Sequence, residues 1–368
     1  MPAEARVQAA APFSGSYDPA DVTFLLKPVV MAATGVADKE AAIQSGRRHY
    51  SEMIAPESVP DPAYLALYHA ALARNGARLA QDVASLAAYL AARRPGREVV
   101  IVSLARAGTP IGVLLVRALR AHGHAAHHYS VSIIRDRGID LSALAHIAAR
   151  HDPGDAVFVD GWTGKGAIAG ELRAALAERP FGFAPVLAVI ADPAGQADIA
   201  ATDDDYLIAS GLLNGIVSGL VSRSILNAEM VGPGDFHACV TYPQYADADL
   251  SRAFVDGIAP LTAATAPRPI DGHGVRREAL REGCEAMMTA LLAHGGTRDR
   301  NRIKPGIAEA TRALLRRMPE RLLVRDRGDA DVAHLLHLAA EHAIPVEALG
   351  GDSHYRAVVI IRSLGHDS

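Results

Sequence analysis

The sequence predicts an α/β fold, a parallel sheet flanked by helices, followed by a small C-terminal αβ domain. Short apolar runs alternate with stretches of helical periodicity between residues 99 and 190, which is typical of βαβ units. A second series of helix and strand signals covers residues 300–364, and a Pro- and Ala-rich stretch at 259–272 precedes it. We therefore expect a first domain over residues 1–258, a linker and helix over 259–295, and a second domain over 296–368.

Each predicted element follows from hydrophobic periodicity and from its boundary residues. Residues 62–93 carry apolar side chains at helical spacing and predict two helices. The β-branched and apolar runs predict strands at 99–104, 127–134, 156–159 and 185–190, separated by helices. In the tail, the pattern predicts a helix after Pro305 and Gly306, a strand, a second helix and two further strands.

Composition limits the function classes. The chain has 368 residues, of which 50% are apolar and 21% charged, and its net charge of −4 does not favour general attraction to nucleic acid. Its two cysteines, Cys239 and Cys284, form neither a disulfide framework nor a CxxC metal pair. We find no basic, apolar leader and no 18-residue apolar span, so we expect a soluble, cytoplasmic protein.

A first candidate loop, SLARAGTPIG at 103–112, follows a predicted strand and opens a helix. An open α/β sheet places its ligand at such strand ends, and helix amides and arginine favour phosphate there. The candidate phosphate-binding residues of this loop are Ser103, Arg106, Ala107, Gly108 and Thr109. The alternative is an ordinary strand–helix turn with a surface arginine.

A second candidate loop lies in AVFVDGWTGKGAI at 156–168. Its glycines free backbone amides to surround a phosphate, Lys165 adds a donor, and Asp160 could hold ribose hydroxyls or a Mg²⁺ ion. The spacing excludes a P-loop. The alternative is a structural Gly-rich turn. The candidate phosphate-binding residues are Gly161, Trp162, Thr163, Gly164, Gly166 and Ala167.

Charged residues flank these loops. Arg135, Asp136 and Arg137 follow a predicted strand, and arginine forks suit pyrophosphate oxygens, although a solvated ion-paired turn has the same composition. Arg223 lies in an apolar setting that suits either a pocket wall or the core.

The thiol of Cys239 is an alternative nucleophile. His237 is two residues away, and residues i and i+2 of a strand stand too far apart for a direct thiolate–imidazole pair. A reactive Cys239 would need a distant histidine such as His49 or His128; otherwise it is a small core residue.

The C-terminal tail concentrates positive charge on a chain that is acidic as a whole, as expected of a protein that binds a phosphate backbone. The alternative is a docking domain with a solvated basic face. The candidate RNA-binding residues are Lys304, Gly306, Glu309, Thr311, Arg312 and Arg316.

These motifs resemble known families. The loop at 156–168 resembles the PRPP-binding loop of type I phosphoribosyltransferases, and SLARAGTPIG resembles their pyrophosphate loop, although Gly161 stands where that family has a second acid. PGIAEATR resembles the RNA-contacting run of the Pelota and kink-turn-binding family, with Ala308 in place of an asparagine. With FSGSYDPADVTFLLKPV and IQSGRRHYSEM, the chain resembles the bacterial StiP family, which is associated with tellurite-type stress.

The resemblance implies a function. It implies a phosphoribosyltransferase that moves a ribose phosphate from PRPP, with Mg²⁺, to a nucleobase-like acceptor, and that binds RNA through its C-terminal domain. The implied catalytic residues are Asp160, which would also bind the metal, Lys165, Arg135, Asp136 and Arg137. The alternatives are a StiP-type cysteine protease that uses Cys239, or a non-catalytic protein that binds a ligand and RNA. No membrane partner is expected, and a homo-oligomer is left open.

Overall fold

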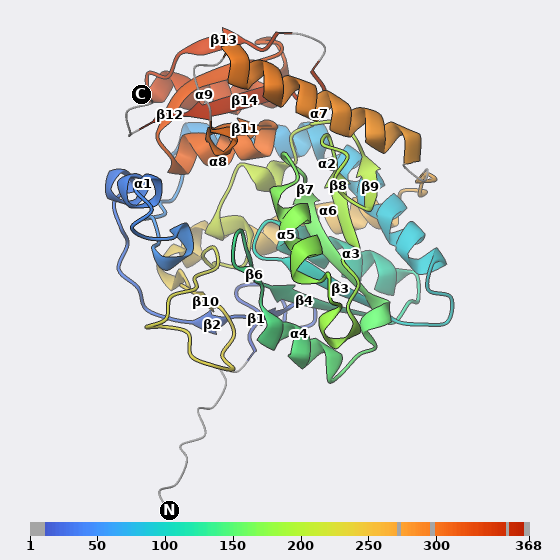
Figure 1. Cartoon of the computed structure of the whole chain (residues 1–368). Coiled ribbons are helices and arrows are strands. Elements are labelled where there is room, and N and C mark those ends of the chain that lie inside the picture. Colours follow the sequence, from blue (N-terminus) through green and yellow to red (C-terminus); the bar gives the residue numbers. More distant parts are fainter. Residues whose placement is uncertain (1–11, 271–273, 295–298, 351–352, 364–368) are drawn as a thin grey trace, which may run out of the picture.

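A six-stranded parallel sheet forms the centre of the first unit (Figure 1). The computed structural model describes residues 12–270, 274–294, 299–350 and 353–363. The order β1-β4-β3-β7-β8-β9 places a topological switch point at β3 and β7, where open α/β sheets form ligand crevices. The strands are β1 (Thr23–Leu25), β3 (Val99–Leu104), β4 (Ala126–Val131), β7 (Ala156–Trp162), β8 (Leu187–Ala191) and β9 (Ile199–Thr202).

Helices cover both faces of this sheet, and the alternation of strand side chains assigns each residue to one face. Ile101 and Val159 pack in the core shared with α2, α3 and α6, whereas Val102 and Phe158 pack on the opposite face with α4 and α5. The predicted α/β class with a parallel sheet is confirmed. The helices are α1 (Val36–Gln44), α2 (Pro62–Ala92), α3 (Gly108–Ala121), α4 (Leu141–Ala148), α5 (Ala167–Ala175) and α6 (Ser251–Ala263).

Residues 62–93 form one long helix, so the prediction of two helices was wrong. Asp61 caps it by accepting hydrogen bonds from the next turn, and the helix continues through Gly76. A Cβ at Gly76 would lie only 3.3 Å from Ile258 of α6, so the glycine serves close helix packing instead of a break.

Two short ribbons complete the first unit. β2 (Lys27–Pro28) pairs in parallel with β10 (Ala238–Cys239), and β5 (Ile133–Ile134) pairs antiparallel with β6 (Gly138–Ile139). The predicted strand over 127–134 is therefore divided between β4 and β5.

The C-terminal unit is a four-stranded sheet with helices on both faces. Helices α8 (Ile307–Arg316) and α9 (Ala333–Glu341) pack on one face, in a core continuous with that of the first unit. Helix α7 (Gly274–His294) packs on the other face through Cys284 and Met288 and crosses the top of Figure 1. The strands are β11 (Ile303–Pro305), β12 (Pro319–Val324), β13 (Val346–Ala348) and β14 (Ala357–Ile361).

The predicted linker is shorter than expected from composition, because α6 continues to Ala263 with Pro260 inside it. The predicted start of the last domain, residues 296–298, lies outside the described residues. Since α7 supplies Cys284 and Met288 to the core of the C-terminal sheet, a fragment that begins at 296 lacks part of that core.

No helix in the described ranges combines the length and hydrophobicity needed to span a bilayer.

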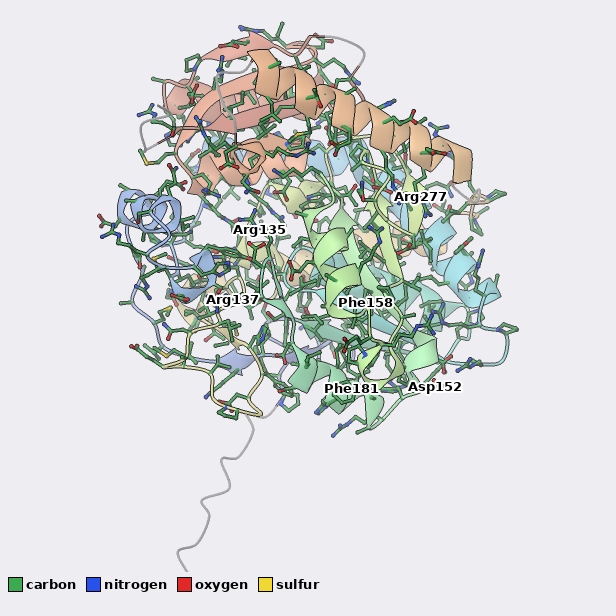
Figure 2. All side chains as sticks on the ribbon, viewed as in Figure 1. Arg135, Arg137, Asp152, Phe158, Phe181 and Arg277 are labelled. Atoms are coloured by element: carbon green, nitrogen blue, oxygen red, sulfur yellow. The ribbon has the colours of Figure 1, made fainter. Side chains whose placement is uncertain are left out.

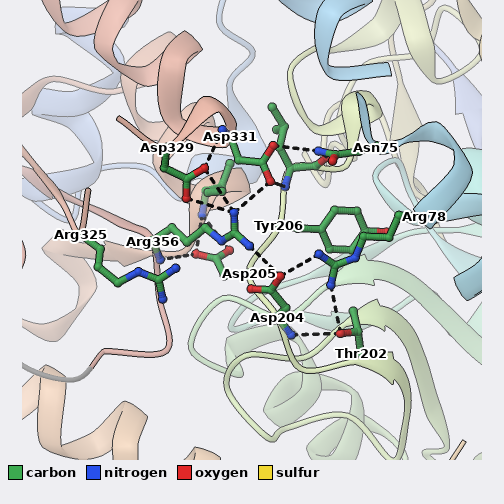
Figure 3. A network of polar contacts seen from close by, with 12 residues as sticks. Asn75, Arg78, Thr202, Asp204, Asp205, Tyr206, Arg325, Asp329, Asp331 and Arg356 are labelled. Carbon is green, nitrogen blue, oxygen red and sulfur yellow. Dashed lines mark hydrogen bonds and ion pairs between the residues drawn. The ribbon is translucent and has the colours of Figure 1, made fainter. Parts of the chain in front are cut away.

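A polar network joins the two units (Figure 3). Arg356 directly precedes β14. Its guanidinium forms ion pairs with Asp204 at 2.7 Å and with Asp329 and Asp331 at 3.0 and 3.1 Å. Asp331 also binds Arg74 of α2 at 2.8 Å. Buried Asp205 accepts the Ile307 amide, the first residue of α8, at 3.0 Å, and the Arg356 amide at 2.9 Å. These contacts fix the position of α8 over the first unit.

We expect Arg356→Met to lower the free energy of unfolding by about 2–4 kcal/mol, because three carboxylates would lose their shared counter-charge in a largely buried place. Chemical denaturation measures the change. Arg325→Met is the matched control, since the only hydrogen bond of the Arg325 guanidinium in the described residues goes to the exposed Ser353 carbonyl at 3.3 Å. Equal stability of the two variants would contradict the role of the network.

Candidate functional site

The loops that follow β3 and β7 lie side by side at the switch point of the sheet, because these two strands are paired neighbours. Their glycines serve packing. A Cβ at Gly108 would lie 2.3 Å from the Val159 carbonyl oxygen, so α3 begins directly against β7. Gly166 has a φ of 84° and caps α5. A Cβ at Gly164 would lie 2.7 Å from Glu309 of the C-terminal unit. The second loop is thus covered by α8.

Several residues that were predicted to bind phosphate form hydrogen bonds with other protein groups instead. Ser103 is fully buried with its hydroxyl 2.8 Å from His128 Nε2, and Thr109 is fully buried with its hydroxyl 2.8 Å from that of Ser130. Neither hydroxyl faces the cleft, so these two assignments require correction. Thr163 lies at the cleft but donates its hydroxyl to Asp192 at 2.5 Å. Ala107, Trp162 and Ala167 line the cleft, whereas Gly161 is buried behind it.

The predicted cations are held by protein groups. Arg106 binds both carboxylate oxygens of Glu57 and donates to the Val221 carbonyl at 2.6 Å. Lys165 donates to the carbonyl oxygens of Arg300 and Ile303 in the C-terminal unit. Both side chains therefore already have partners within the protein, whereas the sequence suggested that they would be available to bind a ligand.

The segment Arg135–Arg137 divides between the cleft and the surface. Arg135 lines the cleft and lies nearer to the C-terminal unit than Arg137 in the view of Figure 2. Arg137 pairs with Glu52 at 3.0 Å, and the exposed Asp136 carboxylate pairs with Arg135 at 3.3 Å. Asp136 and Arg137 do not line the cleft, so a catalytic role for them requires correction.

Four of the six predicted RNA-binding residues face the first unit. Lys304, Glu309, Arg312 and Arg316 line the cleft, and the Arg312 guanidinium lies 4.9 Å from the ring centre of Trp162. Gly306 and Thr311 are buried, and the Thr311 hydroxyl bonds to the Ile307 carbonyl and to His334 at 2.8 and 2.7 Å. These last two residues support the α8 backbone and cannot contact RNA in this structure.

The cleft consists of two adjoining cavities of about 200 and 280 Å³ that share Tyr50, Trp162 and Arg312. Arg223 lines the smaller cavity, which favours the pocket-wall interpretation of the sequence over the core one. Sequence reasoning missed Ser210 and Ser224 in the same cavity, because serines in irregular segments carry no motif signal.

Burial shifts the pKa values of several groups in the cleft. Burial raises the pKa of Asp160 to about 6, against the effect of Arg312. Burial, with Lys165 nearby, lowers the pKa of Lys304 to about 7. Burial and Arg135 lower the pKa of Lys165 to about 8. The charge of the cleft therefore changes within the physiological pH range.

The described residues contain two groups of side chains that could share a metal ion: Glu98 with His127 and His151, and Asp61 with His337 and Glu341. Neither group includes Asp160 or lies at the cleft. Mg²⁺ at Asp160 stays a prediction.

Both thiols are buried. Cys239 is 0% exposed, and burial raises its pKa to about 12. The ring of His237 contacts the Ser132 hydroxyl at 2.8 Å, His49 contacts Ser51, and His128 contacts Ser103. No described hydrogen bond joins Cys239 to the distant histidines that the sequence suggested as its partners.

Cys284 lies in α7, where burial raises its pKa and the Tyr355 hydroxyl stands 3.2 Å from its sulfur. Burial therefore favours the protonated form of both thiols, and the thiolate is the reactive form.

Comparison with known proteins identifies both units. Residues 15–259 match the family described as tellurite-like stress resistance cysteine protease StiP, and residues 283–363 match the PELOTA RNA binding domain. A protein of Acinetobacter baylyi named cysteine protease StiP is 41% identical over an alignment of 365 positions that covers 96% of this chain and 95% of the relative.

Solved phosphoribosyltransferases are similar over a smaller part of the chain. The hypoxanthine phosphoribosyltransferase of Trypanosoma cruzi matches 34% of this chain and 75% of its own, at 14% identity and a TM-score of 0.26. An alanine mutant from a study of an invariant aspartic acid in HPRTs matches 34% of this chain and 77% of its own, at 14% identity and a TM-score of 0.27. Likeness at this level carries no argument about the reaction.

The expected phosphoribosyltransferase reaction with PRPP is contradicted. The relative that aligns with 96% of the chain is named a cysteine protease, and the family model that matches residues 15–259 has the same description. The geometry is consistent with this correction, because the Thr163 hydroxyl and the Lys165 ammonium are bonded to protein groups and the second acid of the motif is Gly161. Since the family match covers residues 15–259 and the relative spans nearly the whole chain, the chain belongs to the StiP family.

Proposed function

We propose that this chain is a cysteine protease and that Cys239 supplies its nucleophile. The observation that carries the proposal is the 41% identity, over 96% of the chain, to a relative with that name. The choice of thiol follows from the family match, because Cys239 is the only one of the two cysteines within residues 15–259.

The surroundings of Cys239 add a condition to this proposal. A thiol protease needs an exposed thiolate with a base in reach. Here the Cys239 side chain is buried in the main core, and its strand β10 pairs with the β2 segment, where the Val29 amide donates to the Cys239 carbonyl at 2.8 Å. Lys27 of β2 is held in turn by Asp235 at 2.7 Å. The proposal therefore includes an activation step that uncovers the thiol and brings a base to it.

We expect Cys239→Ala to lower the rate at which the full chain cleaves an unfolded, fluorescent protein substrate by roughly a thousandfold or more, because the nucleophile is removed. Cys284→Ala is the matched control, since Cys284 is equally buried but lies outside the family match, and it should retain the rate. Melting curves of both variants check folding. Cleavage by Cys239→Ala at the native rate would exclude this thiol.

We also propose that the C-terminal unit binds RNA in the cleft. The match of residues 283–363 to the PELOTA RNA binding domain supports RNA as the ligand. The position of α8 supports the cleft as the place, since Lys304, Glu309 and Arg312 line it together with Trp162 of the first unit. An RNA base stacked on Trp162 would then lie beside the cations of α8.

We expect Arg312→Gln and Trp162→Ala each to weaken binding of the full chain to structured RNA by about fivefold to a hundredfold, because each removes a charge or a stacking surface. Fluorescence anisotropy at two salt concentrations measures the change. Arg327→Gln is a control, because Arg327 is exposed on the same unit and does not line the cleft. A full loss in Arg327→Gln with native affinity in Trp162→Ala would place RNA on the outer face instead.

RNA affinity should rise as the pH falls from 8 to 6. Lys165 and Lys304, with pKa values of about 8 and 7, gain positive charge over this range, and Asp160, with a pKa of about 6, begins to lose its negative charge. All three changes favour a phosphate backbone. Lys304→Arg keeps its charge at every pH and should flatten the dependence. A profile in which affinity falls toward pH 6 would contradict the cleft as the binding place.

A further inference from the structure

Four arginines converge on the smaller cavity of about 200 Å³: Arg106, Arg223, Arg312 and Arg316. Only two of them have a carboxylate partner. Arg106 pairs with Glu57, and Arg312 pairs with Glu309 at 2.7 Å. Among the described residues, Arg223 and Arg316 have no carboxylate oxygen within 4 Å. Within the described residues, the cavity wall therefore holds two arginines without an ion-pair partner, although Nη2 of Arg223 donates to the Tyr50 and Met53 carbonyl oxygens.

Polar atoms of this wall are also without partners. Nη1 of Arg223, Nε of Arg316 and the hydroxyls of Ser210 and Ser224 are buried and form no hydrogen bond within the described part of the chain. The two serines are 6% and 5% exposed. Unpaired buried donors are costly, and in native structures a cluster of them around one cavity calls for a specific explanation.

We propose that this cavity binds the phosphate group of a phosphate monoester. A monoester dianion matches the two unpaired arginines in charge, and guanidinium forks and serine hydroxyls match its oxygens in geometry. The volume suits a small anion. Tyr50 and Trp162 stand at the wall toward the second cavity, where an organic group attached to the phosphate would lie.

The site is built by both units. Arg316 and Arg312 come from α8, whereas Arg223, Ser210 and Ser224 come from the first unit. A bound dianion would therefore link the two units at a place where arginines of both units face one another. The inference is independent of the proposed thiol chemistry, because Cys239 does not line this cavity.

The test uses the full chain with inorganic phosphate and with adenosine 5′-monophosphate, by calorimetry and by thermal melting. The native protein should bind one of them and melt at a higher temperature with it. Arg223→Gln and Arg316→Gln should each weaken binding at least tenfold. Their melting temperatures without ligand should be equal to or above that of the native protein, because each substitution removes repulsion between buried cations.

Arg93→Gln is the matched control, since Arg93 stacks on Tyr89 at 4.7 Å and does not line the cavity. Short RNAs with and without a 5′-phosphate distinguish an RNA end from a free small molecule as the source of the phosphate group. Preference for the phosphorylated RNA alone would assign the site to an RNA end, and binding of the small compounds would assign it to a free monoester. Native affinity in both cavity variants, or no binding of any of these probes at millimolar concentration, would overturn the proposal.

Discussion

The contact of Arg356 and Asp205 with the opposite unit is the constraint on which the candidate site depends. Asp205 holds the first amide of α8, and Arg356 joins carboxylates of both units (Figure 3). Because helix α8 is fixed at its first turn, its basic face is aimed at the loops after β3 and β7. The first unit alone would contribute only the loops after β3 and β7, and the C-terminal unit alone would contribute only the basic helix α8. The cleft forms only where the two units pack together.

Much of the fold could be predicted because periodicity records burial. Strands β3, β7 and β8 are largely buried on both faces, and their sequences show it as runs of mostly apolar residues, interrupted only by residues such as Ser103 and Asp160. The prediction of two helices over residues 62–93 was wrong, and the single helix α2 contains Gly76, a residue that local rules count against a helix interior. The close packing that Gly76 allows is against Ile258, which is distant in sequence and close only in the fold.

The location of the candidate site was easier to predict than the roles of its residues. The two loops do meet at the switch point, and Arg223 does line a cavity. The partners that occupy the motif side chains are remote: Glu57 for Arg106, Asp192 for Thr163. A sequence motif identifies possible hydrogen-bond donors, but it does not show whether these groups already bond to other parts of the protein. For the same reason, Thr311 matches an RNA-binding motif, and yet its hydroxyl forms a hydrogen bond with His334 inside the protein.

The thiol and the cavity are connected by one segment. Residues 220–225 carry Arg223 and Ser224 into the cavity wall and pair with the strand of Cys239 through the Val221–Thr241 and Ile225–Ala238 bridges. Arg223 is also tied to the Tyr50 carbonyl at 2.5 Å. The segment that lines the cavity therefore also borders the strand that carries Cys239, although Cys239 itself does not line the cavity.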